Sequence, residues 1–452
     1  MAKLQSFNPS TGEVVGEVPL ATVEEVHAAV VRARAAQPAW AAVPIEERVA
    51  LLEKAAKILA ERADELGNLL TREMGKPIRE ARGECVVVAQ MLADDPAAVA
   101  EALAPETFEN ERTRTTLFRD AFGVVACISP WNFPIMMPHQ QVCPALVAGN
   151  TVVTKPSEET PLIAQAYYDC LLEVLPDGVL NVVHGAEEVG KALVSADVNL
   201  IVFTGSREAG KHILAEASKG LKRVILELGG KDPLIVLDDA DIPAAAKFTA
   251  NNSFRNAGQV CISTERIYVE PAVHDRFVTA LQAAAERMTV GDGLDAATRI
   301  GPMIHSQQRA HVIAQVEAAV AEGATVAWDG GGASGDSFLA PIILTDCTHD
   351  MAIARDETFG PVACIYRVAD EDEAVRLAND TRFGLGASVF GSSERALKVA
   401  RQLTAGMIGV NQGLGSAGST PWVGSGESGY GFHSGPDGHR QFSQVRVVSE
   451  RL

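Results

Sequence analysis

The sequence predicts an α/β fold in which helices cover both faces of parallel sheets. From residue 122 onward, short β-branched segments alternate with helical ones, and a second alternating region runs from about 265 to 410. Because strands buried on both faces are apolar along their whole length, this alternation is typical of parallel sheets. The chain has 452 residues, more than one hydrophobic core usually supports, so we expect two or three domains.

Hydrophobic periodicity places the individual elements. Apolar residues spaced by four and three from Ile45 to Leu70 predict one long amphipathic helix, which Gly75 and Pro77 would end. Residues 113–119 alternate in polarity and suit a protruding hairpin, and 441–449 are expected to form an edge strand. Further expected strands are 123–128, 151–154, 179–183, 200–203, 224–228 and 234–236, with helices at 161–175 and 207–218, and the segments of the second region include 266–269, 273–288, 363–367 and 387–390.

The composition excludes several kinds of partner. Lys plus Arg minus Asp plus Glu is 39 − 58 = −19, a balance that repels phosphate backbones and anionic lipid, so we expect neither nucleic acid nor a membrane as partner. No apolar run approaches a membrane span, and the first residues lack the apolar core of a secretion signal. The seven cysteines are widely spaced without a Cys-x-x-Cys pair, which indicates a reducing cytoplasm and no metal site.

The first alternating region lacks the usual nucleotide motifs, because it contains neither Gly-x-Gly-x-x-Gly nor a P-loop. Residues 203–206 (Phe-Thr-Gly-Ser) end a strand before a helix, where glycine admits a close ligand and the helix N-terminus offers free N–H groups to phosphate. Lys155 and Glu158 follow another strand and could grip the hydroxyls of a ribose. On spacing alone, a common turn and a solvated loop are the simpler explanations.

Three residues in suggestive surroundings point to chemistry on a carbonyl carbon. Cys261 lies in a polar, glycine-containing segment, and a thiolate is the strongest common protein nucleophile. Glu227 ends an apolar strand before a Gly-Gly turn, where a poorly solvated carboxylate can have a raised pKa and act as a general base. Asn132 is held between two prolines, and its amide suits a developing oxyanion. Each feature alone has a structural explanation, but their conjunction favours catalysis.

The sequence resembles the aldehyde dehydrogenase superfamily over nearly the whole chain. Glu227 precedes Cys261 at the spacing that the family pattern requires, and the matching segments occur in the family's order. The segments that carry the resemblance are 8–13, 130–134, 155–161, 203–206, 227–231, 258–261, 357–362 and 406–411.

The resemblance implies a fold and a mechanism. The fold would hold two parallel-sheet Rossmann-like domains and a β-flap for oligomerisation. Cys261 would attack the aldehyde to give a thiohemiacetal, whose oxyanion the side-chain amide of Asn132 and the backbone N–H of Cys261 would hold. Hydride transfer to the nicotinamide would leave a thioester, and Glu227 would activate the water that hydrolyses it to a carboxylic acid.

An NAD(P) site without the usual glycine fingerprint is also implied. Lys155 and Glu158 would grip the adenosine ribose, and Glu357 would bind the nicotinamide ribose. Because a carboxylate such as that of Glu158 accepts hydrogen bonds from free ribose hydroxyls and repels a 2′-phosphate, we expect NAD to be preferred, although some relatives with this glutamate also use NADP. The residues expected at the cofactor are Ser129, Trp131, Lys155, Ser157, Glu158, Gly190, Phe203, Gly205, Ser206, Leu228, Gly229, Glu357 and Phe359.

Two classes of small-molecule aldehyde stay open. Arg255 stands where succinate-semialdehyde dehydrogenases, which this chain resembles there, carry an arginine that grips the substrate carboxylate. The second carboxylate-binding arginine of those enzymes is Gln140 in this chain, and their redox-switch cysteine is Ser263. Trp422, Tyr430 and Phe432 would instead suit an apolar or aromatic aldehyde if they lie near the substrate tunnel, and packing at a subunit interface is the alternative explanation for them. A coenzyme A-acylating dehydrogenase and a non-catalytic protein of the same fold are further alternatives, against which the complete catalytic set argues.

Domain boundaries and assembly follow from the same resemblance. We expect residues 1–102 and 122–230 to form the cofactor-binding domain and 231–425 the catalytic domain. Residues 103–121 and 426–452 would be oligomerisation segments. Relatives pair such strands into dimers or dimers of dimers, so we expect a homodimer or a homotetramer.

Overall fold

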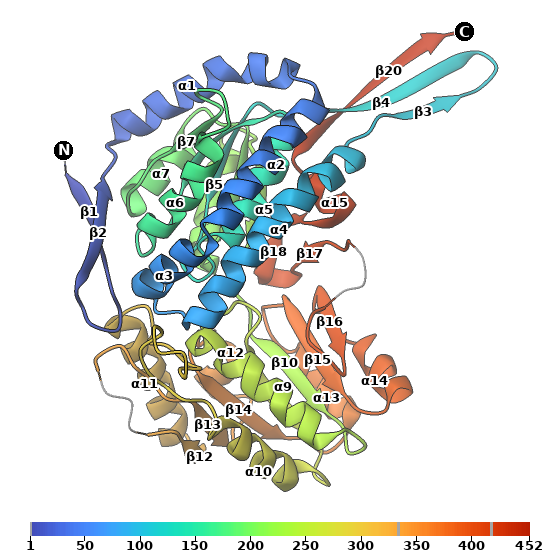
Figure 1. The fold of residues 1–452 in the computed structure, drawn as a ribbon. Coiled ribbons are helices and arrows are strands. Elements are labelled where there is room, and N and C mark those ends of the chain that lie inside the picture. The colour runs from blue at the N-terminus through green and yellow to red at the C-terminus, as the bar shows by residue number, and fades with distance from the viewer. Residues whose placement is uncertain (1, 332–334, 416–418) are drawn as a thin grey trace.

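A six-stranded sheet forms in the upper half of the molecule as drawn in Figure 1. The computed structural model describes residues 2–331, 335–415 and 419–452. The strand order is β18-β9-β8-β5-β6-β7; the strands from β5 to β9 run parallel, and β18, from near the end of the chain, joins β9 antiparallel. The expected strands of this region are confirmed as β5 (Val124–Ile128), β6 (Thr151–Lys155), β7 (Leu180–Val182), β8 (Leu200–Thr204) and β9 (Arg223–Glu227), with β18 at Gly429–Tyr430.

Helices cover both faces of this sheet, as the all-apolar strands predict. Along β5, Val125 and Cys127 belong to one hydrophobic core, while Val124 and Ala126 belong to another on the opposite face. Helices α2 to α6 pack in the first core, and α1, α7 and α8 pack in the second. Their bounds are α1 (Val23–Ala42), α2 (Ile45–Glu61), α3 (Ala63–Met74), α4 (Ile78–Ala102), α5 (Met136–Val147), α6 (Pro161–Leu172), α7 (Glu187–Ser195) and α8 (Arg207–Ser218).

The single helix expected from residue 45 to 70 is wrong, because two helices, α2 and α3, meet at Arg62. Arg62 leaves helical geometry at φ −97° and ψ 2°, and its side chain turns to Glu65 and to the sulfur of Cys170. The apolar spacing continues across this break without a glycine or a proline, so the pattern does not reveal it. The expected end is confirmed: Gly75 closes α3 in the left-handed conformation, at φ +85°.

A seven-stranded sheet occupies the lower half in Figure 1, in the order β12-β13-β14-β11-β10-β15-β16. All neighbours are parallel except β12 and β13, and one large core joins the sheet to its helices. The strands are β10 (Asp232–Val236), β11 (Thr264–Val269), β12 (Thr325–Asp329), β13 (Ile342–Thr345), β14 (Val362–Arg367), β15 (Gly386–Phe390) and β16 (Met407–Val410); the helices are α9 (Ile242–Phe254), the 3₁₀ turn η1 (Arg255–Gly258), α10 (His274–Ala285), α11 (Ser306–Ala321), α12 (Ala352–Arg355), α13 (Glu371–Asn379) and α14 (Ser393–Ala400).

A three-stranded antiparallel arm projects from the upper half (Figure 1). It consists of β20 (Ser443–Arg451), β4 (Thr113–Ala121) and β3 (Glu106–Glu109), so the expected hairpin and the expected terminal edge strand are both confirmed. The remaining elements are β1 (Lys3–Phe7), β2 (Val14–Pro19), β17 (Trp422–Val423), the 3₁₀ turn η2 (Gly426–Ser428), β19 (Phe432–His433) and α15 (Gly435–Arg440).

These observations confirm the α/β class with two parallel sheets, while the division into domains stays a prediction. Across the described residues, no helix combines the length and the apolar character that a membrane crossing needs.

Candidate active site

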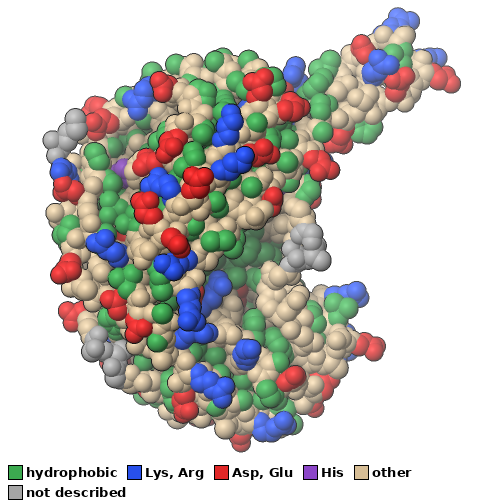
Figure 2. Space-filling model, viewed as in Figure 1, with side chains coloured by type: hydrophobic (Ala, Val, Ile, Leu, Met, Phe, Trp, Pro, Cys, Tyr) green, Lys and Arg blue, Asp and Glu red, His purple; other side chains and the backbone are tan. Residues whose placement is uncertain are grey.

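A cavity of about 810 Å³ is lined by residues from both halves of the molecule. Figure 2 shows the molecular surface hollowed between the two halves, with hydrophobic side chains inside the hollow. Asn132 lines the cavity from the loop after β5, Cys261 from the turn before β11, and Glu357 from the loop before β14. A cavity of this size is typical of small-molecule sites.

The loop before Cys261 has an uncommon backbone. Asn256, Ala257 and Gly258 all adopt the left-handed conformation, at φ 51°, 55° and 71°. A Cβ on Gly258 would lie 2.1 Å from the carbonyl oxygen of Gly360, so only glycine fits at that close approach. Of the seven cysteines, all of which lie in the described part of the chain, Cys261 is the one that keeps some exposure.

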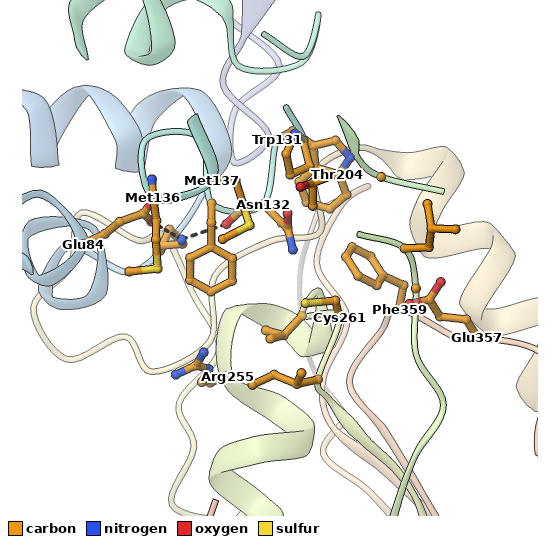
Figure 3. A pocket seen from close by; sticks show the side chains of 18 of the residues that line it. Glu84, Trp131, Asn132, Met136, Met137, Thr204, Arg255, Cys261, Glu357 and Phe359 are labelled. Atoms are coloured by element: carbon orange, nitrogen blue, oxygen red, sulfur yellow. Dashed lines mark hydrogen bonds and ion pairs between the residues drawn. The ribbon is translucent and has the colours of Figure 1, made fainter. Parts of the chain in front are cut away.

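Gln259 connects the nucleophile loop to Asn132. The side-chain amide of Asn132 donates to the carbonyl oxygen of Gln259 (3.1 Å), which also accepts from Asn256 (3.2 Å). Because a primary amide carries two N–H groups, one N–H of Asn132 stays available to another acceptor. In Figure 3 the side chain of Asn132 extends from its loop toward Cys261.

A buried ion pair fixes the loop that carries Asn132. Lys76 and Glu84 pair with both side chains about 2% exposed, and Lys76 Nζ donates to the carbonyl oxygen of Asn132 (2.8 Å). The other carboxylate oxygen of Glu84 accepts from the backbone N–H groups of Ile135 and Met136 at the start of α5. The pair therefore ties the Asn132 loop to α4 through charge-assisted hydrogen bonds.

The electrostatic surroundings of Cys261 oppose its ionisation. Burial raises the pKa of the Cys261 thiol well above its ordinary value, and the carboxylates of Glu227, Asp232 and Glu357 raise it further. Burial also raises the pKa of both Asp232 and Glu357 to about 8. In the cofactor-free protein the thiol is therefore the dominant form at neutral pH.

The predicted base Glu227 ends β9 and is buried. Its charge acts on Cys261, but its side chain does not belong to the cavity lining among the described residues. Instead, Glu227 Oε1 lies 2.7 Å from Nε2 of His433, a buried histidine on β19.

The predicted cofactor residues gather at one edge of the six-stranded sheet, where the carboxyl ends of its parallel strands lie. Lys155 Nζ contacts Glu158 (3.2 Å) and the carbonyl oxygen of Gly185 (2.7 Å), and Gly190 on α7 packs against the Lys155 side chain. Of the predicted set, Ser129 and Trp131 follow β5; Lys155, Ser157 and Glu158 end or follow β6; Phe203, Gly205 and Ser206 lie within or after β8; and Leu228 and Gly229 follow β9.

Glu357 and Phe359 approach this edge from the other half of the molecule. The Glu357 carboxylate accepts from Gly230 N–H (3.1 Å), and a Cβ on Gly229 would clash with it at 2.2 Å. Phe359 meets Trp131 edge to face, with ring centroids 5.6 Å apart. Figure 3 shows Glu357 and Phe359 on one side of Cys261 and the side chains of Glu84 and Met136 on the other.

The three predicted substrate residues all line the same cavity. Arg255 is exposed and packs over the ring of Phe133 at 5.7 Å, and no ion pair forms at it within the described residues. Gln140 Oε1 and Trp422 Nε1 are buried there without a hydrogen-bond partner among those residues.

Sequence reasoning missed Lys76, Glu84, Gln259 and His433. Gln259 stands two residues before the nucleophile, so it could have been proposed from its place in the motif. The other three lie far from Asn132 and Glu227 along the chain, and no local pattern marks them.

Comparisons with known proteins agree with this geometry. The family model described as the aldehyde dehydrogenase family matches residues 2–448. A probable NADP(+) succinate-semialdehyde dehydrogenase of Sinorhizobium fredii is 40% identical, covering 98% of this chain and 91% of its own. A glutarate-semialdehyde dehydrogenase of Pseudomonas aeruginosa is 38% identical, covering 98% and 92%. The crystal structure of an NADP-dependent enzyme from Escherichia coli superposes with a TM-score of 0.96 at 35% identity, covering 100% and 95%.

The comparisons confirm the membership that the motifs predicted: the family model matches nearly the whole chain, and the fold of the Escherichia coli enzyme agrees over the full length of this chain. The chain therefore belongs to the aldehyde dehydrogenase family, and it is an NAD(P)-dependent enzyme that oxidises an aldehyde to a carboxylic acid.

Proposed function

We propose that the enzyme oxidises a small aldehyde that carries a carboxylate, such as succinic semialdehyde, through a thioester on Cys261. The observation that carries the choice of substrate is Arg255, whose guanidinium has no ion-pair partner in the described residues and lines the same cavity as Cys261. A guanidinium binds a carboxylate through paired hydrogen bonds. Similar proteins named for succinate and glutarate semialdehydes support the same class.

In the first step, the Cys261 thiol gives its proton to water, the sulfur of the resulting thiolate attacks the carbonyl carbon, and the carbonyl oxygen takes up the negative charge. The free N–H of the Asn132 amide stabilises that oxygen together with the backbone N–H of Cys261. Gln259 holds the amide in place through the other N–H, so little reorganisation is needed when the charge develops.

A bound nicotinamide cofactor supplies the hydride acceptor. The residues at the sheet edge fit such a group: Ser206 caps α8 by accepting from Ala209 N–H (3.3 Å), and a Cβ on Gly205 would lie 2.5 Å from the Phe203 ring. This turn leaves backbone N–H groups at a helix N-terminus for a diphosphate. Glu357 would hold the nicotinamide ribose, with Phe359 and Trp131 beside it.

Glu227 completes the reaction by taking a proton from water, whose oxygen then attacks the thioester carbon and releases the acid and the Cys261 thiolate. The presence of Glu227, whose charge acts on Cys261, favours water over coenzyme A as the acyl acceptor.

We further propose that NAD is preferred over NADP. The Glu158 carboxylate pairs with Lys155 at the end of β6, where it would accept from ribose hydroxyls and repel a 2′-phosphate. Two of the similar proteins are NADP enzymes by name, so the ratio of kcat/KM for the two cofactors is the deciding measurement.

An apolar or aromatic aldehyde is the second candidate, because Phe133, Met136, Met137 and Trp422 line the same cavity. A steady-state comparison of succinic semialdehyde, hexanal and benzaldehyde separates the two classes. We expect succinic semialdehyde to have the highest kcat/KM, and Arg255→Ala to lower it about 10- to 100-fold, as loss of a charge-assisted hydrogen bond predicts. If Arg255→Ala leaves that value unchanged, or if benzaldehyde is preferred, the carboxylate assignment is wrong.

We propose that the three-stranded arm (β20, β4 and β3) pairs with other subunits to form a homodimer or a homotetramer. Within the described residues, strands β3 and β20 each pair with β4 alone and so have an unpaired edge, and Phe108, Val445 and Val447 are exposed on the arm. Light scattering after deletion of residues 443–452 should show a smaller assembly than the full chain; an unchanged mass would contradict this role.

A further inference from the structure

The segment 357–359 brings Glu357 and Phe359 to the cavity, and the side chain of Glu265 on β11 holds its backbone. The N–H of Thr358 donates to Glu265 Oε2 (2.9 Å), and the N–H of Phe359 donates to Glu265 Oε1 (3.0 Å). Phe359 has φ +50°, a left-handed conformation that a residue with a large side chain keeps only where its surroundings fix it. Both oxygens of the Glu265 carboxylate therefore help to hold this strained segment in place.

Glu265 is in turn held by Lys231, and both side chains are buried. Lys231 Nζ forms an ion pair with Glu265, and the two side chains are 0% and 2% exposed. Lys231 Nζ also donates to Thr358 Oγ1 (2.9 Å), which donates to Gln315 Oε1 (2.8 Å). A buried ion pair is favourable only where hydrogen bonds satisfy its remaining polar atoms, and the segment 357–359 supplies three of these bonds.

The pair of Lys231 and Glu265 also acts on Glu357 by two further routes. Lys231 directly follows Gly230, whose N–H donates to the Glu357 carboxylate (3.1 Å). Burial, followed by the charge of Glu265, raises the pKa of Glu357 to about 8, and the charge of Lys231 opposes this rise. One buried pair therefore influences Glu357 through its own segment, through the glycine turn that it contacts and through charge.

We propose that Glu265 and Lys231 are positioning residues that hold the Glu357 carboxylate where it can bind the nicotinamide ribose. This inference rests on the proposed role of Glu357 at the cofactor. Neither Glu265 nor Lys231 belongs to the described lining of the cavity, so both act through the segment 357–359 and not by touching cofactor or substrate. A carboxylate that is already held in place loses little freedom when the cofactor binds, and this raises the affinity.

The variant Glu265→Gln tests this role by changing one polar group of the side chain. Glutamine presents an NH2 group where one carboxylate oxygen accepted, so one backbone N–H of the segment loses its acceptor and Lys231 loses its counter-ion. In the protein without cofactor, hydrogen–deuterium exchange followed by mass spectrometry should show faster exchange in the peptide that contains Thr358 and Phe359. Native protection of that peptide would overturn the inference.

Binding and kinetic measurements then report the effect on the cofactor site. The dissociation constant for NAD, followed by quenching of tryptophan fluorescence, should rise about 10- to 100-fold in Glu265→Gln, as weakened hydrogen bonding to a charged group predicts. KM for NAD should rise with it, while KM for succinic semialdehyde and the rate of Cys261 alkylation by iodoacetamide stay close to the native values. Equal changes in all of these quantities would indicate a general structural effect and would overturn the inference.

Glu270→Gln is the matched control, because Glu270 directly follows the same strand β11 and is also a buried carboxylate in an ion pair. It pairs with Arg395 (2.9 Å) and does not belong to the described lining of the cavity. This variant carries the same chemical change, so exchange in the 357–359 peptide and the affinity for NAD should both stay native. A loss of NAD affinity as large as that of Glu265→Gln would contradict a role specific to Glu265.

The double variant Glu265→Gln/Glu357→Gln distinguishes action through Glu357 from an independent effect on the cofactor site. If Glu265 acts through Glu357, the double variant binds NAD no more weakly than Glu357→Gln alone, and losses that multiply would overturn the inference. Native affinity in Glu265→Gln beside weak binding by Glu357→Gln would also overturn it and leave the proposed function intact. Unchanged affinity in Glu357→Gln would remove the proposed cofactor contact itself, and the inference with it.

Should Glu265→Gln fail to fold, Thr358→Val repeats the test with the ion pair left intact. Valine removes only the hydroxyl that accepts from Lys231 and donates to Gln315. We expect faster exchange in the 357–359 peptide and a several-fold lower affinity for NAD, because the segment loses one of its hydrogen bonds to the pair. Native exchange together with native affinity in this variant would overturn the inference.

Discussion

Replacing Asn132 by alanine tests the proposed oxyanion site most quantitatively. The Asn132 amide has two N–H groups, and one is already bonded to the carbonyl oxygen of Gln259. The substitution therefore removes one donor to the oxyanion, which costs about 100- to 1,000-fold in the rate of the step, or about 2.7–4 kcal/mol. The loop itself should survive, because the Gln259 oxygen keeps the amide of Asn256 as a donor and Lys76 binds the Asn132 backbone.

The assay is the single-turnover rate of NADH formation at saturating cofactor, monitored by stopped-flow absorbance. Alkylation of Cys261 by iodoacetamide should proceed at the native rate, since that reaction forms no oxyanion. Asn68→Ala, the same change on an exposed position of α3, should leave both rates within about twofold, as expected of a surface substitution. An Asn132→Ala variant that keeps more than about a tenth of the native rate would refute the assigned role.

Three further predictions follow from other parts of the structure. Glu158→Ser removes a carboxylate that would repel a 2′-phosphate, so kcat/KM with NADP relative to NAD should rise at least about tenfold; an unchanged ratio would contradict the cofactor argument. Because burial and neighbouring carboxylates raise the pKa of the Cys261 thiol, the thiolate fraction grows with pH, and the alkylation rate of cofactor-free enzyme should still be rising at about pH 9; a plateau below about pH 8 would argue against this environment. Lys76→Met leaves the buried Glu84 carboxylate without its counter-ion and should cost about 3–5 kcal/mol of unfolding free energy in urea titrations. Lys3→Met breaks an exposed pair and should cost less than about 1 kcal/mol; equal costs for the two variants would contradict the difference in burial.

Local sequence pattern was sufficient to predict the parallel strands of the six-stranded sheet, because a strand that is buried on both faces has a mostly apolar sequence. β5, β6 and β8 all begin and end close to where their apolar runs begin and end. Hydrophobic periodicity did not predict the break between α2 and α3 at Arg62. The apolar face continues from one helix to the next, and the backbone conformation of Arg62 requires neither glycine nor proline, so no residue type marks the break.

Motifs placed Asn132, Cys261 and Glu357 at one cavity, because each lies in a segment whose order along the chain matches the family. The sequence could not predict contacts between side chains that lie far apart along the chain. The hydrogen bond from Lys76 to Asn132 and the contact of His433 with Glu227 depend on tertiary packing, which leaves no periodic signal in either segment.

The thioester on Cys261 is the central claim, and its capture is the most direct test. The Glu227→Gln enzyme is mixed with succinic semialdehyde and NAD and quenched in acid within the first turnovers. The protein is then digested, and the masses of its peptides are measured by mass spectrometry. We predict that the peptide containing Cys261 gains the mass of the acyl group and that Cys261→Ala forms neither this adduct nor NADH. NADH production by Cys261→Ala at the native rate, with no acyl group on any peptide, would contradict the account.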